Sequence, residues 1–389
     1  MRLFIFVFWS FAAIAKPLHV EVTASSLMLM NADTGAILYE KNGHISAYPA
    51  STTKIATALF ILDEKKPPWD RMLTVSEESL KMKPLNKKGD YPLHWWDADG
   101  TRMWLKAGEI LSVEMLLHGL MLISGNDAAN VLAEGIGGST VTFQEELNRY
   151  LKQIGCLNTH FVNAHGCHHP EHVSTAYDLC LITQKALHFP QFREIVAKTS
   201  YMKPKTNKQG PVELKQFNQL IKPGKFQYAK AIGVKTGFHS AAQNTLVAAA
   251  EENGRTLIAV VLGTTNSGDR YLDAIRLFEA AFAETKETRR FFGKEHLFTR
   301  QVTGAKTVLK AALAEDLNLS YYPAEEPICR AFIHWGSPSL PIRKNEIVGE
   351  VRIVNEKGAL LGRADLCAKE EVKGTVFFVL QDFMTHLFR

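Results

Sequence analysis

Residues 49–62 read PASTTKIATALFIL, in which a short polar segment leads directly into an apolar one. The proline suits the first turn of a helix, where a missing backbone N–H leaves no hydrogen bond unmade. In a helix that starts here, Ser51 and Lys54 are three residues apart and share one face. The segment therefore places an amine beside a hydroxyl at the N-terminus of an expected helix.

A hydroxyl next to an amine is a candidate pair of nucleophile and base. Serine is a weak nucleophile at its ordinary pKa, and a neighbouring base is the usual way to activate it. A helix N-terminus also favours the negative charge that develops on a substrate oxygen. The S-x-x-K pattern alone is common, however. A capped helix start followed by a solvated lysine explains it without a catalytic role for either residue.

Two further motifs follow along the chain. Residues 124–126 read SGN after the apolar segment 115–123, and residues 235–237 read KTG inside the strand-like segment 232–237. The order S-x-x-K, S-x-N, K-T-G is that of penicillin-binding proteins and class A β-lactamases. Three ordered motifs, each in a suitable helix, loop or strand setting, argue against a chance match.

The chain closely resembles the low-molecular-mass penicillin-binding proteins that are D-alanyl-D-alanine carboxypeptidases. The resemblance covers most of residues 25–285 and, more weakly, the rest. Beyond the three motifs, the similar segments are 27–42, 124–129, 158–163 and 165–166. The resemblance implies an α+β fold like that of serine β-lactamases and DD-peptidases. Such a fold has an antiparallel sheet with helices on its faces and a helical lobe, here followed by a small C-terminal all-β domain.

Hydrophobic periodicity gives the same division of the chain. The helices that it predicts are 51–63, 111–123, 126–134, 142–154, 176–187 and 269–284. Strands are expected within 25–42 and at 233–235, 245–250 and 257–262, with a hairpin turn at 252–254. The charged segment 284–290 suits a linker. We therefore expect a catalytic domain at 20–285 and a small β domain at 291–375.

Both ends of the chain carry an apolar segment. Residues 1–15 combine Met1-Arg2, an apolar run and an A-I-A exit, which predicts a secretory signal peptide cleaved after Ala15. Residues 376–389 place their polar side chains on one helical face, which predicts an amphipathic C-terminal membrane anchor. A helix packed on the β domain is the alternative for this tail. These segments predict an exported protein at the periplasmic face of the cytoplasmic (inner) membrane.

The composition argues against some classes of protein. The chain has 389 residues with 46% apolar, enough for two domains with cores of their own. The net charge of +5 is spread out and does not indicate nucleic-acid binding. Five cysteines in loose spacing argue against a disulfide scaffold, although a single bridge stays open in an exported protein.

The resemblance implies acyl transfer through a covalent ester, with peptidoglycan stem pentapeptides as substrates and no cofactor or metal. Ser51 would attack the carbonyl of the penultimate D-Ala, and Lys54 would take the hydroxyl proton. A lysine at its usual pKa of about 10.4 is a poor base, so burial and the cation of Lys235 are expected to lower it. Ser124 would pass a proton to the leaving amine. β-Lactam antibiotics would acylate the same serine as covalent inhibitors.

The remaining site residues implied by the resemblance bind the substrate. Asn126 would hold its amide, while Lys235 and Thr236 would bind its terminal carboxylate. Gly237 leaves room along the strand, and the N–H groups of Ser51 and Phe238 would be the oxyanion donors.

Two features depart from the family pattern. Gln219 follows Asn218 where relatives often have a basic residue near the carboxylate, and Lys222 or Lys225 is a candidate substitute. The segment 93–102 is also unusual and is a candidate for altered substrate access.

Four other functions compete with the carboxypeptidase. A serine β-lactamase needs a carboxylate for deacylation, but Glu145 and Glu146 follow Ser124 too closely and fall inside an expected helix. A non-catalytic binding protein is disfavoured by the intact motifs. Another DD-peptidase activity, either a DD-endopeptidase acting on cross-linked peptidoglycan or a transpeptidase, shares the first half-reaction and stays open. A zinc enzyme is the fourth, but the spacing of its ligand types matches no closed helical pair; these residues are His165, Cys167, His168, His169 and His172.

Overall fold

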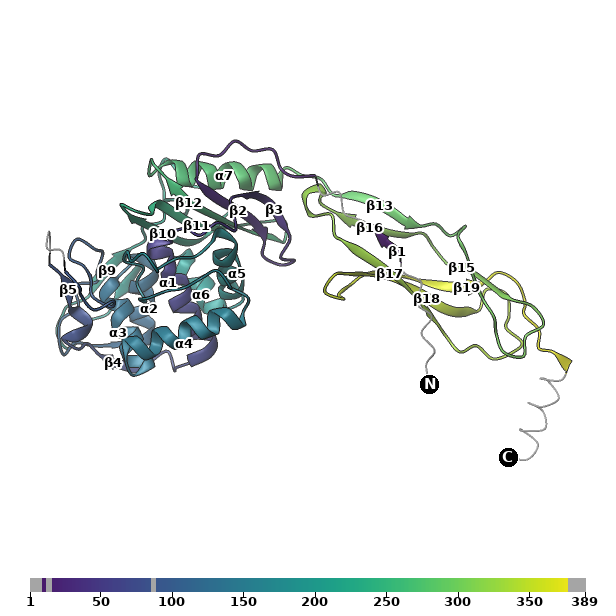
Figure 1. Ribbon diagram of the computed structural model, residues 1–389, viewed down its shortest axis with the longest axis horizontal. Coiled ribbons are helices and arrows are strands. Elements are labelled where there is room, and N and C mark those ends of the chain that lie inside the picture. The colour runs from purple at the N-terminus through teal and green to yellow at the C-terminus, as the bar shows by residue number, and fades with distance from the viewer. Residues whose placement is uncertain (1–8, 12–15, 85–88, 377–389) are drawn as a thin grey trace, which may run out of the picture. The chain divides into compact units, whose positions relative to one another are not determined.

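The computed structural model describes residues 9–11, 16–84 and 89–376. The chain divides into two compact units (Figure 1), Pro17–Ala283 and Glu284–Arg389, the latter together with Met1–Lys16. All three motifs lie in the first unit, which we call the catalytic unit.

A five-stranded antiparallel sheet with the order β10-β11-β12-β2-β3 is the centre of the catalytic unit. Its strands are β2 (Ser26–Asn31), β3 (Ile37–Lys41), β10 (Ala231–His239), β11 (Gln243–Glu252) and β12 (Arg255–Thr264). The expected hairpin joins β11 to β12. Asn253 and Gly254 both have positive φ, at 52° and 73°, which a two-residue turn of type I′ requires.

Helices cover both faces of this sheet. Helix α7 (Asp269–Phe282) contacts β11 and β12, whereas α5 (Ala176–Leu187) contacts β12 and β2. Figure 1 shows α7 on one side of the sheet and α5 with α6 (Pro190–Ala197) on the other. The sequence predicts that the helix at 176–187 ends near Pro190 but not that a new one begins there. Pro190 is tolerated because it occupies the first helical turn.

The helical lobe consists of α2 (Val113–Leu122), α3 (Asn126–Gly137) and α4 (Thr140–Gln153). Ser112 and Ser139 cap α2 and α4 by accepting from backbone N–H groups of the first turn, at 3.2 and 3.0 Å. These expected helices are present with small shifts at their ends.

Helix α1 (Lys54–Phe60) joins the lobe to the sheet, and all of its residues are buried. Ile55 and Leu59 of α1 share one core with Met28 and Val260 of the sheet and Ile182 of α5. Burial of each such side chain contributes roughly 1.5–3 kcal/mol. The expected helix at 51–63 is therefore real, but it begins as a 3₁₀ turn (Ala50–Thr53) and ends in a π turn (Ile61–Lys65).

Short elements occupy the remaining loops of the catalytic unit. They are strands β4 (Met72–Thr74), β5 (Met82–Lys83), β6 (Trp96–Asp97), β7 (Ile110–Ser112), β8 (Ser200–Lys203) and β9 (Val212–Lys215), and 3₁₀ turns at Glu78–Leu80 and Gln219–Ile221.

The second unit is the expected all-β domain. Its six-stranded sheet has the order β1-β17-β18-β19-β15-β14, and β13 pairs with β16. The strands are β1 (Trp9–Phe11), β13 (Glu287–Phe292), β14 (Leu297–Arg300), β15 (Leu309–Leu313), β16 (Leu317–Tyr321), β17 (Cys329–Trp335), β18 (Ile347–Asn355) and β19 (Leu360–Ala368), with a 3₁₀ turn at Pro323–Glu325. Charged residues of the expected linker form part of β13, so this unit starts at Glu284 rather than at residue 291.

The two terminal predictions fall mostly on residues outside the described ranges. Of the expected signal peptide, only Trp9–Phe11 is described, as a strand antiparallel to β17. The expected anchor at 376–389 lies outside the described residues apart from Val376. None of the helices in the described part of the chain is long and apolar enough to cross a membrane. All five cysteines lie in the described part and are free thiols.

Candidate active site

The amine of Lys54 contacts the hydroxyl of Ser51, as the S-x-x-K spacing predicts. Lys54 Nζ donates to Ser51 Oγ at 3.0 Å, to Asn126 Oδ1 at 2.7 Å and to the carbonyl oxygen of His165 at 2.5 Å. Lys54 is fully buried, whereas Ser51 is partly exposed. A buried amine thus lies against a hydroxyl that a substrate can reach.

Burial lowers the pKa of Lys54 to about 7. About half of the amine is then neutral at neutral pH, which is the state that a general base requires. The Lys54 and Lys235 ammonium groups also repel each other, and this repulsion contributes to the lowered pKa of Lys235. The pKa of Lys235 is lowered well below its usual value by burial and then by the charges of Lys54 and Arg270.

Ser51 follows a sharp turn of the backbone. Ala50 has φ of 49°, a left-handed conformation that is strained for a residue other than glycine. Thr53 Oγ1 donates to the Ala50 carbonyl at 2.8 Å, and Thr52 Oγ1 donates to the Pro49 carbonyl at 2.7 Å. These two hydroxyls hold the strained turn that presents the nucleophile.

Gly166 packs directly against this turn, and its replacement tests how much the turn depends on that contact. A Cβ at Gly166 would lie 2.0 Å from the Ala50 carbonyl oxygen. Gly155 has nearly the same φ, 93° against 89°, but its Cβ would meet nothing closer than Leu181 Cδ1 at 3.8 Å. We expect Gly155→Ala to cost about 1–2 kcal/mol of unfolding free energy from left-handed strain. Gly166→Ala must cost clearly more and also slow acylation of Ser51. Urea unfolding of both variants measures the difference, and equal losses would contradict the role of this contact.

The S-x-N motif connects α2 to α3. Ser124 has φ of 63°, and its carbonyl accepts from Thr101 Oγ1 at 2.7 Å. The backbone N–H of Asn126 donates to the Thr101 carbonyl at 2.9 Å. Ser124 Oγ is buried and has no hydrogen-bond partner among the described residues. This hydroxyl is therefore free to bond a substrate, while the Asn126 amide oxygen already accepts from Lys54.

The K-T-G motif lies on β10, next to the 3₁₀ turn of Ser51. A Cβ at Gly237 would lie 2.4 Å from Thr245 Oγ1 and 2.9 Å from the backbone nitrogen of Ser51. Only glycine therefore lets this strand approach the N–H of the nucleophile. Lys235 is buried, and its Nζ donates to the carbonyl of Thr236 at 2.9 Å.

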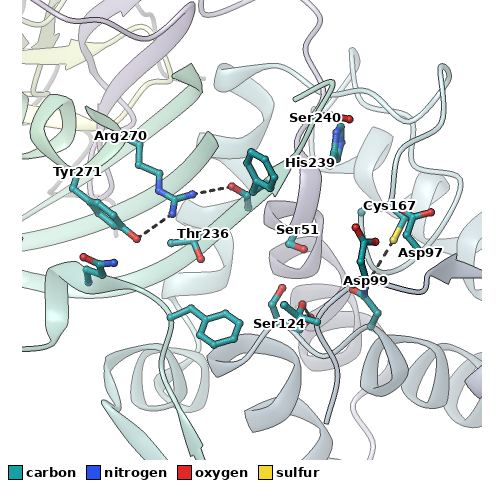
Figure 2. A pocket seen from close by; sticks show the side chains of 18 of the residues that line it. Ser51, Asp97, Asp99, Ser124, Cys167, Thr236, His239, Ser240, Arg270 and Tyr271 are labelled. Atoms are coloured by element: carbon teal, nitrogen blue, oxygen red, sulfur yellow. Dashed lines mark hydrogen bonds between the residues drawn. The ribbon is translucent and has the colours of Figure 1, made fainter. Parts of the chain in front are cut away.

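A cleft of about 750 Å³ opens above these motifs (Figure 2). Six of the predicted site residues line it: Ser51, Ser124, Asn126, Thr236, Gly237 and Phe238. Lys54 and Lys235 are not among its lining residues, because both lie buried beneath its wall. In Figure 2, Ser51 and Ser124 lie between Arg270 on one side and Asp97 with Asp99 on the other.

Arg270 is a cleft residue that the sequence analysis missed. Its Nη1 donates to the Gly237 carbonyl at 2.9 Å and its Nη2 to the Tyr271 hydroxyl at 3.3 Å. Its Nε is buried with no partner in the part of the chain that the structure describes. Nothing in the sequence connects Arg270 with the K-T-G motif, because it belongs to the first turn of α7.

The two lysines that are candidates to replace a basic residue at Gln219 differ in their position. Gln219 and Lys222 line the cleft, whereas Lys225 does not and has its ammonium 5.3 Å from the ring centre of Phe226.

Comparison with known proteins agrees with this geometry. A family model of D-alanyl-D-alanine carboxypeptidases, peptidase family S11, matches residues 12–266. The chain belongs to this family. It is a serine-type hydrolase, and membership implies a peptidoglycan peptide as substrate and binding of β-lactams.

Three relatives illustrate how far the similarity extends. D-alanyl-D-alanine carboxypeptidase DacF of Bacillus subtilis is 28% identical over 91% of this chain and 87% of its own length. The structure of penicillin binding protein 6B from Escherichia coli has a TM-score of 0.65 at 26% identity, covering 91% of this chain and 98% of the other. The Streptomyces K15 DD-transpeptidase has a TM-score of 0.60 at 30% identity and covers 68% of this chain and 98% of its own.

In this carboxypeptidase, the glutamates that a β-lactamase would need and two of the histidines that a zinc enzyme would need make structural contacts instead. Glu146 pairs with Lys65 at 2.5 Å, and neither it nor Glu145 lines the cleft where a deacylating water would be needed. Among the histidines considered for zinc, His172 Nε2 bonds the Thr53 hydroxyl at 2.8 Å. His165 bonds the His94 carbonyl through Nε2 at 3.1 Å and accepts from the Cys167 N–H through Nδ1. These imidazoles support the backbone around the nucleophile.

Proposed function

We propose that this protein removes the terminal D-Ala from peptidoglycan stem pentapeptides through an ester on Ser51. The observation that carries the proposal is the fully buried Lys54 amine, 3.0 Å from the hydroxyl of Ser51 and with its pKa lowered to about 7.

Acylation begins with attack of Ser51 Oγ on the carbonyl carbon of the penultimate D-Ala, while neutral Lys54 takes the hydroxyl proton. The carbonyl oxygen becomes an oxyanion and accepts from the backbone N–H groups of Ser51 and Phe238. When the peptide C–N bond breaks, Ser124 gives its hydroxyl proton to the leaving amine of D-Ala and takes the proton that Lys54 has accepted, so Lys54 is neutral again. The buried Ser124 hydroxyl has no competing partner among the described residues, which supports this role. In deacylation, neutral Lys54 takes a proton from the water that attacks the ester carbonyl, and it returns this proton to Ser51 Oγ when the ester C–O bond breaks.

Recognition of the substrate carboxylate involves more residues than the K-T-G motif. Thr236 lines the cleft and offers a hydroxyl, and Arg270 beside it is a cation whose Nε–H has no partner among the described residues. Lys235 lies buried beneath, where a bound carboxylate would favour its protonated form. Asn126 lines the same cleft and would bond the peptide amide through its Nδ2, because its Oδ1 accepts from Lys54.

Incubation with a stem pentapeptide tests the proposal. We expect release of one D-Ala per peptide from the wild-type protein and release at least about 10²-fold slower from Lys54→Met. Free D-Ala is measured by an enzymatic assay, and the tetrapeptide product by mass spectrometry. Cleavage of cross-linked peptide dimers without release from the pentapeptide would contradict the proposal and support the DD-endopeptidase alternative.

We also propose that the protein is exported and acts at the periplasmic face of the cytoplasmic membrane. The support is the signal-like sequence of residues 1–15 and the amphipathic pattern of residues 376–389.

A further inference from the structure

A second cavity of about 440 Å³ lies in the helical lobe, away from the catalytic cleft. Residues of α3, α4, the loop at 92–94 and the segment 160–164 line it, and the described linings of the two cavities share no residue. Its volume is in the range of small-molecule sites. The chemistry of its lining shows which kind of ligand it suits.

Two buried amide oxygens in this lining have no hydrogen-bond donor among the described residues, Asn130 Oδ1 and Gln144 Oε1. Their amide orientation is fixed because the nitrogens are occupied. Asn130 Nδ2 donates to the His94 carbonyl at 2.8 Å, and Gln144 Nε2 donates to the Phe161 carbonyl at 2.8 Å. A buried acceptor without a donor has lost its bonds to water without replacement, which is unfavourable. A ligand with N–H groups would remove that cost at both oxygens.

The charge of the lining favours a cation. Glu145 and Glu171 line the cavity, and none of the described lining residues is a lysine or an arginine. Its two imidazoles bond other groups, His94 the Glu78 carboxylate at 2.8 Å and His160 the Glu171 carbonyl at 3.0 Å. Leu93, Val141 and Phe161 supply apolar wall, and the first two are 46% and 63% exposed. We propose that this cavity binds a primary alkylammonium group, with its N–H donors toward Asn130 and Gln144 and its apolar stem against these side chains.

The contacts around the cavity show which variants can test the proposal. Asn130 is unsuitable because the His94 carbonyl that it bonds also accepts from His165 Nε2, and the His165 carbonyl accepts from Lys54. Among the described residues, the one side-chain hydrogen bond of Gln144 goes to the Phe161 carbonyl and involves neither His94 nor His165. Asn148 Nδ2 also donates to the Phe161 carbonyl, at 2.7 Å, so Gln144→Leu leaves that carbonyl with a partner.

The test titrates butylammonium chloride into the full-length protein by calorimetry, before and after acylation of the catalytic serine by penicillin. The neutral probe is 1-butanol. We expect butylammonium to bind equally well to both forms, and 1-butanol to bind at least about tenfold more weakly. Gln144→Leu should weaken the amine by about tenfold or more. Glu145→Gln should weaken it less, and Glu146→Gln, with the same charge change on the same helix but outside the cavity, should leave it unchanged.

Each contrary outcome overturns the proposal for a separate reason. Loss of binding after acylation would place the amine in the catalytic cleft. Equal affinity for 1-butanol would show an apolar pocket without cation recognition, and equal effects of Glu145→Gln and Glu146→Gln would show unspecific charge attraction. Unchanged penicillin acylation of Gln144→Leu verifies that the variant is folded. If it does not fold, the exposed Glu145 and its matched control Glu146 still decide the question.

Discussion

Replacing Ser51 with alanine is expected to abolish covalent labelling by penicillin and to reduce D-Ala release by a factor on the order of 10⁶, as for removal of other serine nucleophiles. The reason is that both reactions pass through an ester on the same oxygen. In the structure, Ser51 Oγ is the only hydroxyl for which a hydrogen bond from Lys54 Nζ is recorded among the described residues. Gel detection of a fluorescent penicillin and the D-Ala assay measure the two effects.

The control is Ser240→Ala, the same chemical change on another exposed serine of the cleft lining. It is expected to label normally. Retained labelling of Ser51→Ala would instead point to another nucleophile, with the unpartnered hydroxyl of Ser124 as the first candidate.

Nitrocefin adds a check on the type of enzyme. A long-lived acyl-enzyme fits a carboxypeptidase, whereas rapid turnover by the wild-type protein would support the β-lactamase alternative.

The sequence could predict those parts of the fold whose pattern is set by local periodicity and turn chemistry. The central helix follows from the apolar run after Lys54, and the β11–β12 hairpin follows from Asn253-Gly254. Helix α6 cannot be predicted from the sequence, because Pro190 signals the end of a helix as readily as the first turn of another. The sequence of β13 predicts a linker instead of a strand, because its residues 287–290 are mostly charged, and the structure shows them exposed. Its pairing with β16 depends on contacts that no local pattern carries.

The candidate site was predictable where a motif fixes spacing within one element, and not where it depends on contacts between distant elements. The Ser51–Lys54 contact follows from helical spacing alone. Arg270 reaches the K-T-G strand only because α7 packs on β11 and β12. The burial of Lys235 and the bond from Lys54 to Asn126 likewise arise from packing between elements. Motif order identifies the family, but it does not show which polar atoms are already occupied.

Acylation of Ser51 by penicillin is expected to accelerate as the pH rises from about 5 to about 8, with a midpoint near the Lys54 pKa of about 7. Only the neutral amine can accept the hydroxyl proton, so the rate follows the deprotonated fraction.

Lys54→Met keeps the apolar stem and removes the base. We expect it to acylate about 10²–10⁴-fold more slowly and to lose the rise near neutral pH. Stopped-flow acylation across this pH range measures both effects. A wild-type rate that is flat through pH 7 would contradict Lys54 as the base.

The same depressed pKa has a consequence for folding that does not depend on catalysis. Between the folded pKa of about 7 and the usual lysine value of about 10.4, the unfolded chain binds a proton at Lys54 that the native state does not. The free energy of unfolding therefore rises with pH in this window, by up to about 1.4 kcal/mol per pH unit from this group, and the contribution is flat below pH 7. Lys235 adds a slope of the same sign, so the wild type must be compared with Lys54→Met, which lacks the Lys54 part together with the repulsion that Lys54 exerts on Lys235. Urea unfolding of both proteins at several pH values between about 7.5 and 9 isolates that part. A difference that stays constant with pH would mean that burial does not depress this lysine, and the amine would then be charged and unable to act as a base at neutral pH.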